Sequence, residues 1–301
     1  MEIIFGLFNT FFFAPIVNLL VAIYQGLHFL HIPGALGFAI VILTIITRMA
    51  IWPLFNTQIK SAKKMTDLKP HIDELKKKHL DDKKAFTVAQ MALFKEHGVN
   101  PAAGCLPTIL QFPILIALYQ AIMNIFPGVA GFGGSLDTIN AVLYHPSLHL
   151  SVAPDKNFLG LNLATRPSEF MTAGWLLLLV PLVTAGLTFW QAKMMLPKVV
   201  KKYPQEKKEK EKTEDVMAGM QTQMTYLMPI MIGWFAFQFP VALPIYWNTL
   251  TIISIIQQKK IYGLEINKRL AIKSKRILSK NKNIEILIRD GSLGLPEFAP
   301  F

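Results

Sequence analysis

Charged residues are missing from long stretches of this chain. Uncharged runs occupy residues 101–126, 170–192 and 216–258, and a fourth run, Ala35–Ile59, holds a single charge. Such runs are too long for the core helices of a soluble domain and match the ~20 apolar residues that a helix needs to cross a bilayer. The hydrophobic content of 52% and the mean hydropathy of +0.38 are consistent with membrane-crossing helices. The sequence therefore predicts a polytopic membrane protein.

Cysteine and the residue sets of common active sites are also scarce. Cys105 is the only cysteine, which excludes an intramolecular disulfide and a cysteine metal cluster. The four apolar runs contain no histidine and no carboxylate, so they offer neither the base of a serine protease nor an aspartate pair or proton relay. No histidine–carboxylate cluster suggests a metal, and no glycine-rich loop with a following Lys-Ser or Lys-Thr suggests a nucleotide. The sequence predicts a protein that is not an enzyme and uses no cofactor.

The run at residues 216–258 is too long for one span. As a single helix it would extend about 65 Å, roughly twice the hydrocarbon thickness. Phe239–Pro244, with a proline near each end, is the natural point of reversal. We therefore expect an all-α fold, a polytopic bundle of five transmembrane helices. The spans lie at residues 35–59, 101–126, 170–193, 221–239 and 243–260.

Basic residues predict the orientation, because Lys and Arg are retained on the cytoplasmic side. Of the 31 Lys and Arg residues, all but Arg48, Lys156 and Arg166 fall within residues 60–95, 193–212 and 259–289. This pattern puts three segments in the cytoplasm and one outside. The cytoplasmic segments are a helical hairpin at residues 60–100, a loop at residues 194–220 and a basic tail at residues 261–301, and the outer loop is at residues 127–169.

Residues 1–34 form a separate apolar segment. Pro15, Gly26 and His28 interrupt its apolar run, and five spans with a cytoplasmic tail put the start of the first span outside. We therefore expect an interfacial segment in the outer leaflet rather than a sixth span.

The hairpin at residues 60–100 has the period of two amphipathic helices. Met65, Leu68 and Ile72 recur at spacings of three and four, and Ala89 and Leu93 do so in the second half. The hairpin is net positive. It is either a solvated lid near acidic lipid headgroups or a docking element for incoming chains.

Arg48 lies in the middle of Ala35–Ile59, a run that contains no acidic residue. A central arginine costs ~2.5–3.5 kcal/mol on insertion scales, so a chain that keeps one usually turns it toward a polar cavity. The alternative is a span at residues 27–47, which would make Arg48 an interfacial anchor. His31–Gly34 would break that helix near its centre, and the run then begins only about 20 Å before Arg48, which is short of a ~30 Å core.

Several uncharged polar residues share the predicted membrane depth of Arg48. Each alone is by default a helix–helix hydrogen-bonding residue, since such contacts contribute ~0.6 kcal/mol on average in membranes. Together they are able to hydrate a cavity around Arg48. The residues in question include Thr44, Gln111 and Gln191. Trp247 is by default a residue of the interfacial aromatic belt.

Several motifs, in register over nearly the whole chain, resemble the YidC, Oxa and Alb family of membrane protein insertases. They are Gly37–Leu54 (GFAIVILTIITRMAIWPL), Lys60–Leu75 (KSAKKMTDLKPHIDEL), Leu93–Tyr119 (LFKEHGVNPAAGCLPTILQFPILIALY), Phe189–Met194 (FWQAKM), and the MPIM, FP and YW elements of Gln223–Gln258. The beginning of the chain is similar to that of short bacterial YidC-like members.

The resemblance implies a polar groove that is open to the cytoplasm and the lipid but closed outside. By motif matching the groove arginine falls on Arg48, and the further groove residues are Thr44, Gln111, Gln191 and Trp247. A slide for the substrate helix is implied at Pro113, Leu115, Met228, Phe235 and Phe239. The implied location is the bacterial cytoplasmic (inner) membrane, with a cytoplasmic C-terminus. The implied partners are nascent membrane proteins and membrane lipid, with the ribosome, through the basic tail, and the Sec translocon as further candidates.

The predicted function is that of a membrane protein insertase and chaperone. It takes substrate transmembrane segments and short acidic tails into the groove and releases them sideways into the bilayer. Arg48 attracts the acidic tail, and the membrane potential favours its outward movement by about 2.3 kcal/mol per charge and 100 mV. Two other classes stay open: an anion channel or transporter that uses Arg48 as a binding charge, and an assembly factor that holds membrane proteins without moving their tails.

Overall fold

The computed structural model describes residues 2–79, 82–100, 106–126, 135–195 and 216–280, and its regular structure is almost entirely helical. The chain divides into two compact units, Met1–Ile255 and Ile256–Phe301. The first unit holds every residue of the predicted site. α12 (Ala242–Lys280) begins in the first unit and continues in the second. The predicted basic tail is therefore helical up to Lys280, and its remaining residues lie outside the described part.

The N-terminal segment is one continuous helical run. α1 (Glu2–Phe8), the π-helical turn η1 (Asn9–Phe13) and α2 (Ala14–Phe29) follow one another without a gap. Pro15 lacks an N–H and would disturb a regular α-turn. The wider π-turn precedes it, with the Ala14 N–H bonded to the Asn9 carbonyl, and absorbs the irregularity. Pro15, Gly26 and His28, which interrupt the apolar run, therefore lie inside continuous helix. The run Phe5–Phe29 is long and apolar enough to cross a membrane, whereas the sequence predicts an interfacial segment.

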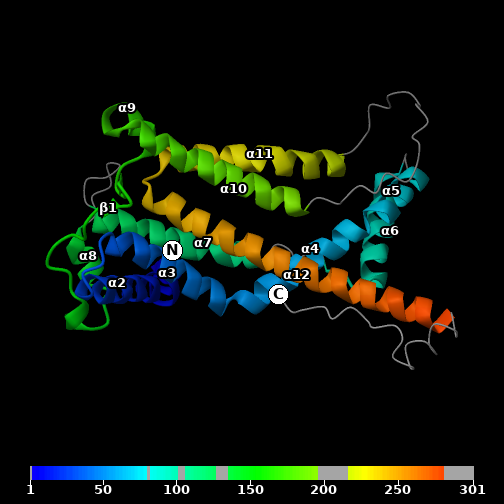
Figure 1. Cartoon of the computed structure of the whole chain (residues 1–301), viewed down its shortest axis with the longest axis horizontal. Coiled ribbons are helices and arrows are strands. Elements are labelled where there is room, and N and C mark those ends of the chain that lie inside the picture. Colours follow the sequence, from blue (N-terminus) through cyan, green and yellow to red (C-terminus); the bar gives the residue numbers. More distant parts are fainter. Residues whose placement is uncertain (1, 80–81, 101–105, 127–134, 196–215, 281–301) are drawn as a thin grey trace, which may run out of the picture. The chain divides into compact units, whose positions relative to one another are not determined.

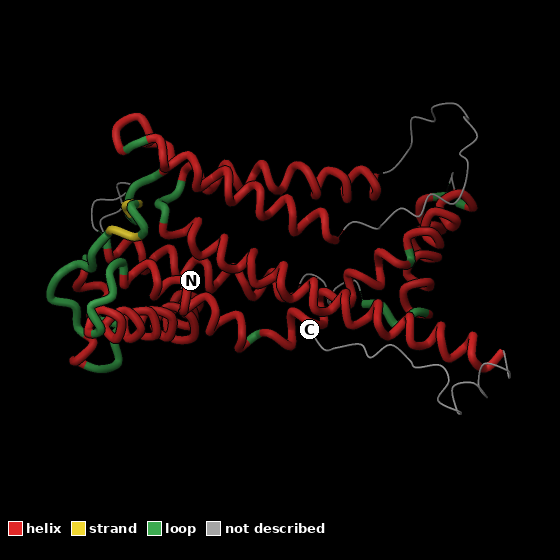
Figure 2. Tube along the Cα trace, in the orientation of Figure 1, coloured by secondary structure: helices red, strands yellow, loops and turns green. Residues whose placement is uncertain are grey.

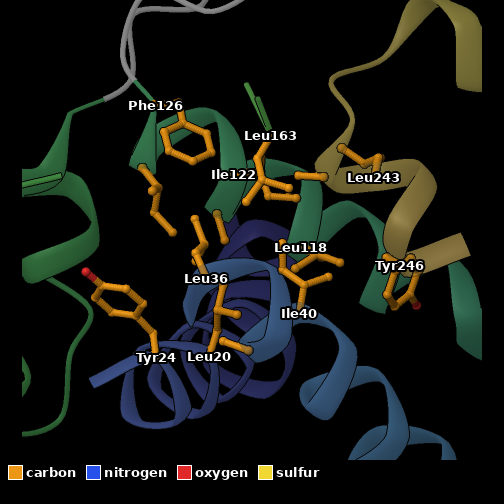
Figure 3. Packing of buried hydrophobic residues seen from close by; sticks show 14 of the residues in the cluster. Leu20, Tyr24, Leu36, Ile40, Leu118, Ile122, Phe126, Leu163, Leu243 and Tyr246 are labelled. Atoms are coloured by element: carbon orange, nitrogen blue, oxygen red, sulfur yellow. The ribbon is translucent and has the colours of Figure 1, made fainter. Parts of the chain in front are cut away.

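The main core lies where α2, α3 (Ala35–Ala50), α7 (Leu106–Ile125) and the start of α12 meet. The chain reverses between α2 and α3 with positive φ at His31 and Gly34, as the breaking sequence between them predicts. Leu20 of α2, Ile40 of α3 and Leu118 of α7 are fully buried there (Figure 3). α2 is thus part of the core and not a peripheral anchor.

Residues 135–169 pack onto this core. They contain α8 (Leu136–Asn140), the 3-10 turns η4 (Pro146–Leu148) and η5 (Pro167–Glu169), and two short strands, β1 (Asn157–Phe158) and β2 (Leu161–Asn162). The strands pair antiparallel, with Phe158 opposite Leu161, and are a small exception to the all-α prediction (Figure 2). Ile139 and Leu163 are fully buried, so the predicted outer loop contributes to the core.

The third predicted span begins later than residue 170. After α9 (Phe170–Ala173), Gly174 adopts a φ of 110° that ends the helix, and the span restarts with η6 (Trp175–Leu178) and α10 (Leu179–Met195). α11 (Val216–Gln238) lies along α10 (Figure 1). A Cβ on Gly233 of α11 would lie 2.9 Å from the Cβ of Ala185 on α10, so small residues allow the two helices to approach closely.

The predicted helical hairpin is present. It consists of α4 (Trp52–Asp67), α5 (Lys69–Lys78) and α6 (Lys83–Glu96), and the Asp82 carboxylate caps α6 by accepting the N–H of Lys84 and of Ala85. Leu68 and Phe94 form a small separate core, against which Met65 and Ile72 pack. On α6 the buried apolar side chain is therefore Phe94, one residue beyond the predicted Leu93.

By length and composition, two helices in the described part of the chain are able to cross a membrane: Phe5–Phe29 and Trp175–Met194. α3 and α4 pass the same test together as a bent pair, and Ile109–Ile125 is a shorter apolar helix.

Candidate functional site

Arg48 lies in the last turn of α3, just before a sharp bend. Ile51 leaves helical geometry with φ −99° and ψ 12°, and Pro53 in the first turn of α4 cannot donate a hydrogen bond to the Met49 carbonyl. α3 and α4 consequently meet at an angle of 70°. The first span predicted at residues 35–59 is a broken helix, and Arg48 stands at the break.

The guanidinium of Arg48 is buried and contacts two other helices. Its Nη2 donates a hydrogen bond of 2.7 Å to Ser254 Oγ on α12, and Ser254 in turn donates to the Leu250 carbonyl. The ring of Phe55, in the first turn of α4, lies 3.2 Å from the guanidinium carbon. On a straight helix residues 48 and 55 would be about 10 Å apart along the axis, so the bend favours this contact. Arg48 is 5% exposed.

A second polar contact joins α7 to α12. Nε2 of Gln111 donates to the hydroxyl of Tyr246, a residue that is 2% exposed. Tyr246 precedes Ser254 on α12 by eight residues, about 12 Å of helix. α12 therefore supplies a hydroxyl to the predicted site residues of two other helices, Arg48 on α3 and Gln111 on α7.

The other predicted groove residues are distributed over three helices. Thr44 is fully buried one turn before Arg48, and its hydroxyl donates to the Ile40 carbonyl of its own helix at 2.6 Å. Thr44 is thus satisfied within α3 and does not need a water-filled cavity. Gln191 on α10 and Trp247 on α12 are both half-buried.

Two of the predicted slide residues, Phe235 and Phe239, are in contact with each other. Phe239 packs edge-on against Tyr119 of α7, with ring centroids 5.7 Å apart, and against Phe235 of α11 at 6.1 Å. Met228 and Phe235 are exposed on α11. On α7, Pro113 is half-buried inside the helix, and Leu115 packs against the main core. The structure brings the ends of the two predicted slide helices together through Tyr119 and Phe239.

Sequence reasoning missed three residues that define the site: Phe55, Tyr246 and Ser254. Phe55 carried a usable signal, since it follows Arg48 by seven residues, across a proline. Ser254 carried none, because a lone serine in an apolar run resembles any helix-packing residue. In the described part of the chain, no three His, Cys, Asp or Glu side chains come close enough together to hold a metal ion.

Comparison with known proteins agrees with the motifs. A family model described as "60Kd inner membrane protein" matches residues 28–268. The chain belongs to this family. MisCA, a membrane protein insertase of Bacillus subtilis (strain 168), is 32% identical over 236 residues, which cover 77% of this chain and 72% of MisCA. The resemblance to the YidC, Oxa and Alb family is thereby confirmed.

Other relatives of the chain are longer. Inner membrane protein ALBINO3 of Arabidopsis thaliana chloroplasts is 32% identical over 253 residues, 81% of this chain and 50% of ALBINO3. Membrane protein insertase YidC of Rickettsia rickettsii (strain Sheila Smith) is 32% identical over 230 residues, 75% of this chain and 35% of YidC. The chain spans about half the length of the ALBINO3 relatives that it matches.

Solved structures similar to this chain include an active YidC insertase with its first transmembrane domain resolved. It is 22% identical, covers 78% of this chain and 45% of its own, and has a TM-score of 0.48.

Proposed function

We propose that this protein is a membrane protein insertase and chaperone. It takes transmembrane segments and short acidic tails of its substrates into a polar groove around Arg48 and releases them laterally into the lipid bilayer. The proposal draws on the family and on the insertases among its relatives. The observation that carries it is the buried position of Arg48 beside a helix bend, since an ionisable side chain within an apolar segment is by default functional.

Arg48 is suited to attract an acidic tail. The hydroxyl of Ser254 and the ring of Phe55 position its guanidinium. A carboxylate about 4 Å from the guanidinium gains roughly 4 kcal/mol at an effective dielectric of 20, before the cost of desolvation. A gain of this size retains a tail without trapping it. The membrane potential then favours outward movement of the negative charge.

The other proposed groove residues are Thr44, Gln111, Gln191 and Trp247, and their parts in the proposal differ. Gln111 and Tyr246 add polar groups between α7 and α12. Gln191 and Trp247 are half-buried and lend polar atoms to the walls. Thr44 contributes little, because its hydroxyl is already bonded within α3.

The substrate helix follows the apolar surface of α11 and the adjoining part of α7. Met228 and Phe235 are exposed on α11, and the contact between Phe239 and Tyr119 links the two helices. Pro113 and Leu115 continue the surface on α7. An apolar segment on this surface leaves by partitioning into lipid, so release requires no nucleotide.

The proposed setting is the bacterial cytoplasmic membrane, with five spans, the helical hairpin on the inside and a cytoplasmic C-terminus. The asymmetry of basic residues supports this orientation. The proposed partners are nascent membrane proteins and lipid, together with the ribosome and the Sec translocon.

Reconstitution tests the function. The full chain is placed in sealed vesicles with a nascent single-span substrate that has a short acidic tail, and a photo-crosslinker replaces Leu115 or Phe235. We expect crosslinks to the apolar segment and a tail protected from added protease. Crosslinks without tail protection would indicate a holding factor, and anion flux without either would indicate a channel; both results contradict the proposal.

A further inference from the structure

Residues 135–165 contact three helices, α3, α2 and α12, at three separate places, which we call fastenings. The first is a notch on α3 that holds the ring of Phe158. A Cβ on Gly34 would lie 3.0 Å from this ring, and a Cβ on Gly37 would overlap it. The ring also packs edge-on against Phe38, with centroids 5.1 Å apart at 86°. Gly37 is an ordinary helical residue, so the nearby ring, and not its backbone conformation, requires glycine there.

The second fastening is Asn18, a buried amide in the apolar helix α2. Its Nδ2 donates to the Val142 carbonyl at 2.8 Å, and its Oδ1 accepts the Tyr144 N–H at 2.6 Å. Both ends of the amide therefore hold the backbone of the segment. Asn18 is 6% exposed, and a buried amide of this kind is costly unless it is fully bonded.

The third fastening is at the start of α12. The first N–H groups of a helix have no partner within the helix. Here the Ala242 N–H donates to the Leu163 carbonyl at 3.1 Å, and the Val241 N–H donates to the Thr165 carbonyl at 3.0 Å. The segment thus caps α12 with its own backbone.

Between these fastenings lies a water-excluding layer of apolar side chains. Leu163 of the segment packs with Ile122 of α7, Phe126 just after α7 and Leu243 of α12, and all four are at most 4% exposed (Figure 3). An ion entering such a layer would lose its hydration without compensation.

The polar site lies three helical turns away from this layer. On α3 Gly37 precedes Arg48 by eleven residues, and on α12 Leu243 precedes Ser254 by eleven. Eleven residues are just over three full turns, about 16 Å, and return to nearly the same helix face. On each of the two helices, one face is therefore apolar at the end that the segment contacts and polar three turns later, at Arg48 on α3 and at Ser254 on α12.

We propose that residues 135–165 are a latch that clamps α2, α3 and α12 together and keeps the apolar layer closed to ions. Phe158, Gly37 and Asn18 are its positioning residues. The latch rests on the proposed insertase function: the groove admits a substrate at the Arg48 end while the latched end prevents leakage.

Proton leak into vesicles tests the latch. The full chain is reconstituted with an entrapped pH-sensitive dye, and a potassium diffusion potential drives protons inward. Gly37→Ala places a methyl group in the ring of Phe158, and Phe158→Ala removes the ring, so each should raise the leak several-fold. In the double variant the added methyl meets no ring, and the leak should not exceed that of Phe158→Ala. Gly26→Ala is the matched control, because a Cβ there meets nothing within 4 Å.

Leak at the wild-type level in both single variants, or additive leak in the double variant, overturns the latch. Two milder changes cover the case in which Gly37→Ala does not fold: Phe158→Leu adds no atom to the notch, and Asn18→Leu releases residues 142 and 144. Wild-type leak in both of these also overturns it.

Tail insertion is measured in the same vesicles. If the wild-type protein does not insert the tail but the variants leak as expected, the insertase function alone is refuted. If the wild-type protein inserts the tail but the variants leak no more than it does, the latch alone is refuted.

Discussion

At the scale of single residues, Arg48 shows how a charge is kept inside an apolar helix pair. The bend at Ile51 turns α4 so that Phe55 covers the guanidinium, and α12 presents Ser254 from the other side. A hydrogen bond from a charged donor stabilises by about 1.5–3 kcal/mol, more than a bond between neutral groups. The two contacts fix the orientation of the guanidinium.

Ser254→Ala should lower the free energy of unfolding by about 1–3 kcal/mol, because a buried N–H of Arg48 loses its acceptor. Equilibrium unfolding of the detergent-solubilised protein measures the loss. Thr251→Val, one turn earlier on α12, is the control, since the Thr251 hydroxyl bonds to the Trp247 carbonyl of its own helix. Equal losses of unfolding free energy in the two variants would show that the hydrogen bond to Arg48 does not stabilise the protein.

The contact between Phe55 and Arg48 should appear as an energetic coupling. Phe55→Leu removes the ring, and a buried cation–π contact is worth about 0.5–2 kcal/mol. In the background of Arg48→Met the same change should cost less by that amount, because the cation is gone. A double-mutant cycle on unfolding free energies measures the difference. A cycle that closes within error would contradict the contact.

At the scale of elements, α10 and α11 form a closely packed pair with large apolar side chains on their outer surface. Gly233 permits the approach, while Leu182, Trp190, Ile230 and Trp234 are exposed. In lipid the hydrophobic effect does not drive such a pair together, so close packing of small residues carries the association. The distance between α10 and α11 is therefore sensitive to a single added methyl group.

Gly233→Ala should destabilise the pair by about 1–3 kcal/mol through overpacking against Ala185. Gly186→Ala on α10 is the matched control, because a Cβ there meets nothing within 4 Å, and it should be neutral or stabilising. The melting temperatures of the two variants in detergent measure this difference in stability. A Gly233→Ala protein as stable as the Gly186→Ala protein would contradict the close approach.

At the scale of the whole molecule, local sequence signals predicted most of the helices. His31–Gly34 marked the start of α3, the helix that carries Arg48. Contacts between residues far apart in sequence were not predictable from one chain. Ser254 is 206 residues from Arg48, and the notch for Phe158 is formed by Gly34, the residue before α3, and by Gly37 in α3. The uninterrupted N-terminal helix was missed because a π-turn accommodates Pro15, and composition does not predict a π-turn.

The most direct test of the central claim combines two Arg48 variants with two substrates. Wild-type, Arg48→Ala and Arg48→Lys proteins are reconstituted in vesicles with an imposed potential, and protease protection is measured for substrates whose tails are acidic or neutral. If Arg48 captures acidic tails, Arg48→Ala loses most translocation of the acidic tail and little of the neutral one, and Arg48→Lys retains both. Equal translocation of acidic and neutral tails by Arg48→Ala would contradict the role of the guanidinium charge.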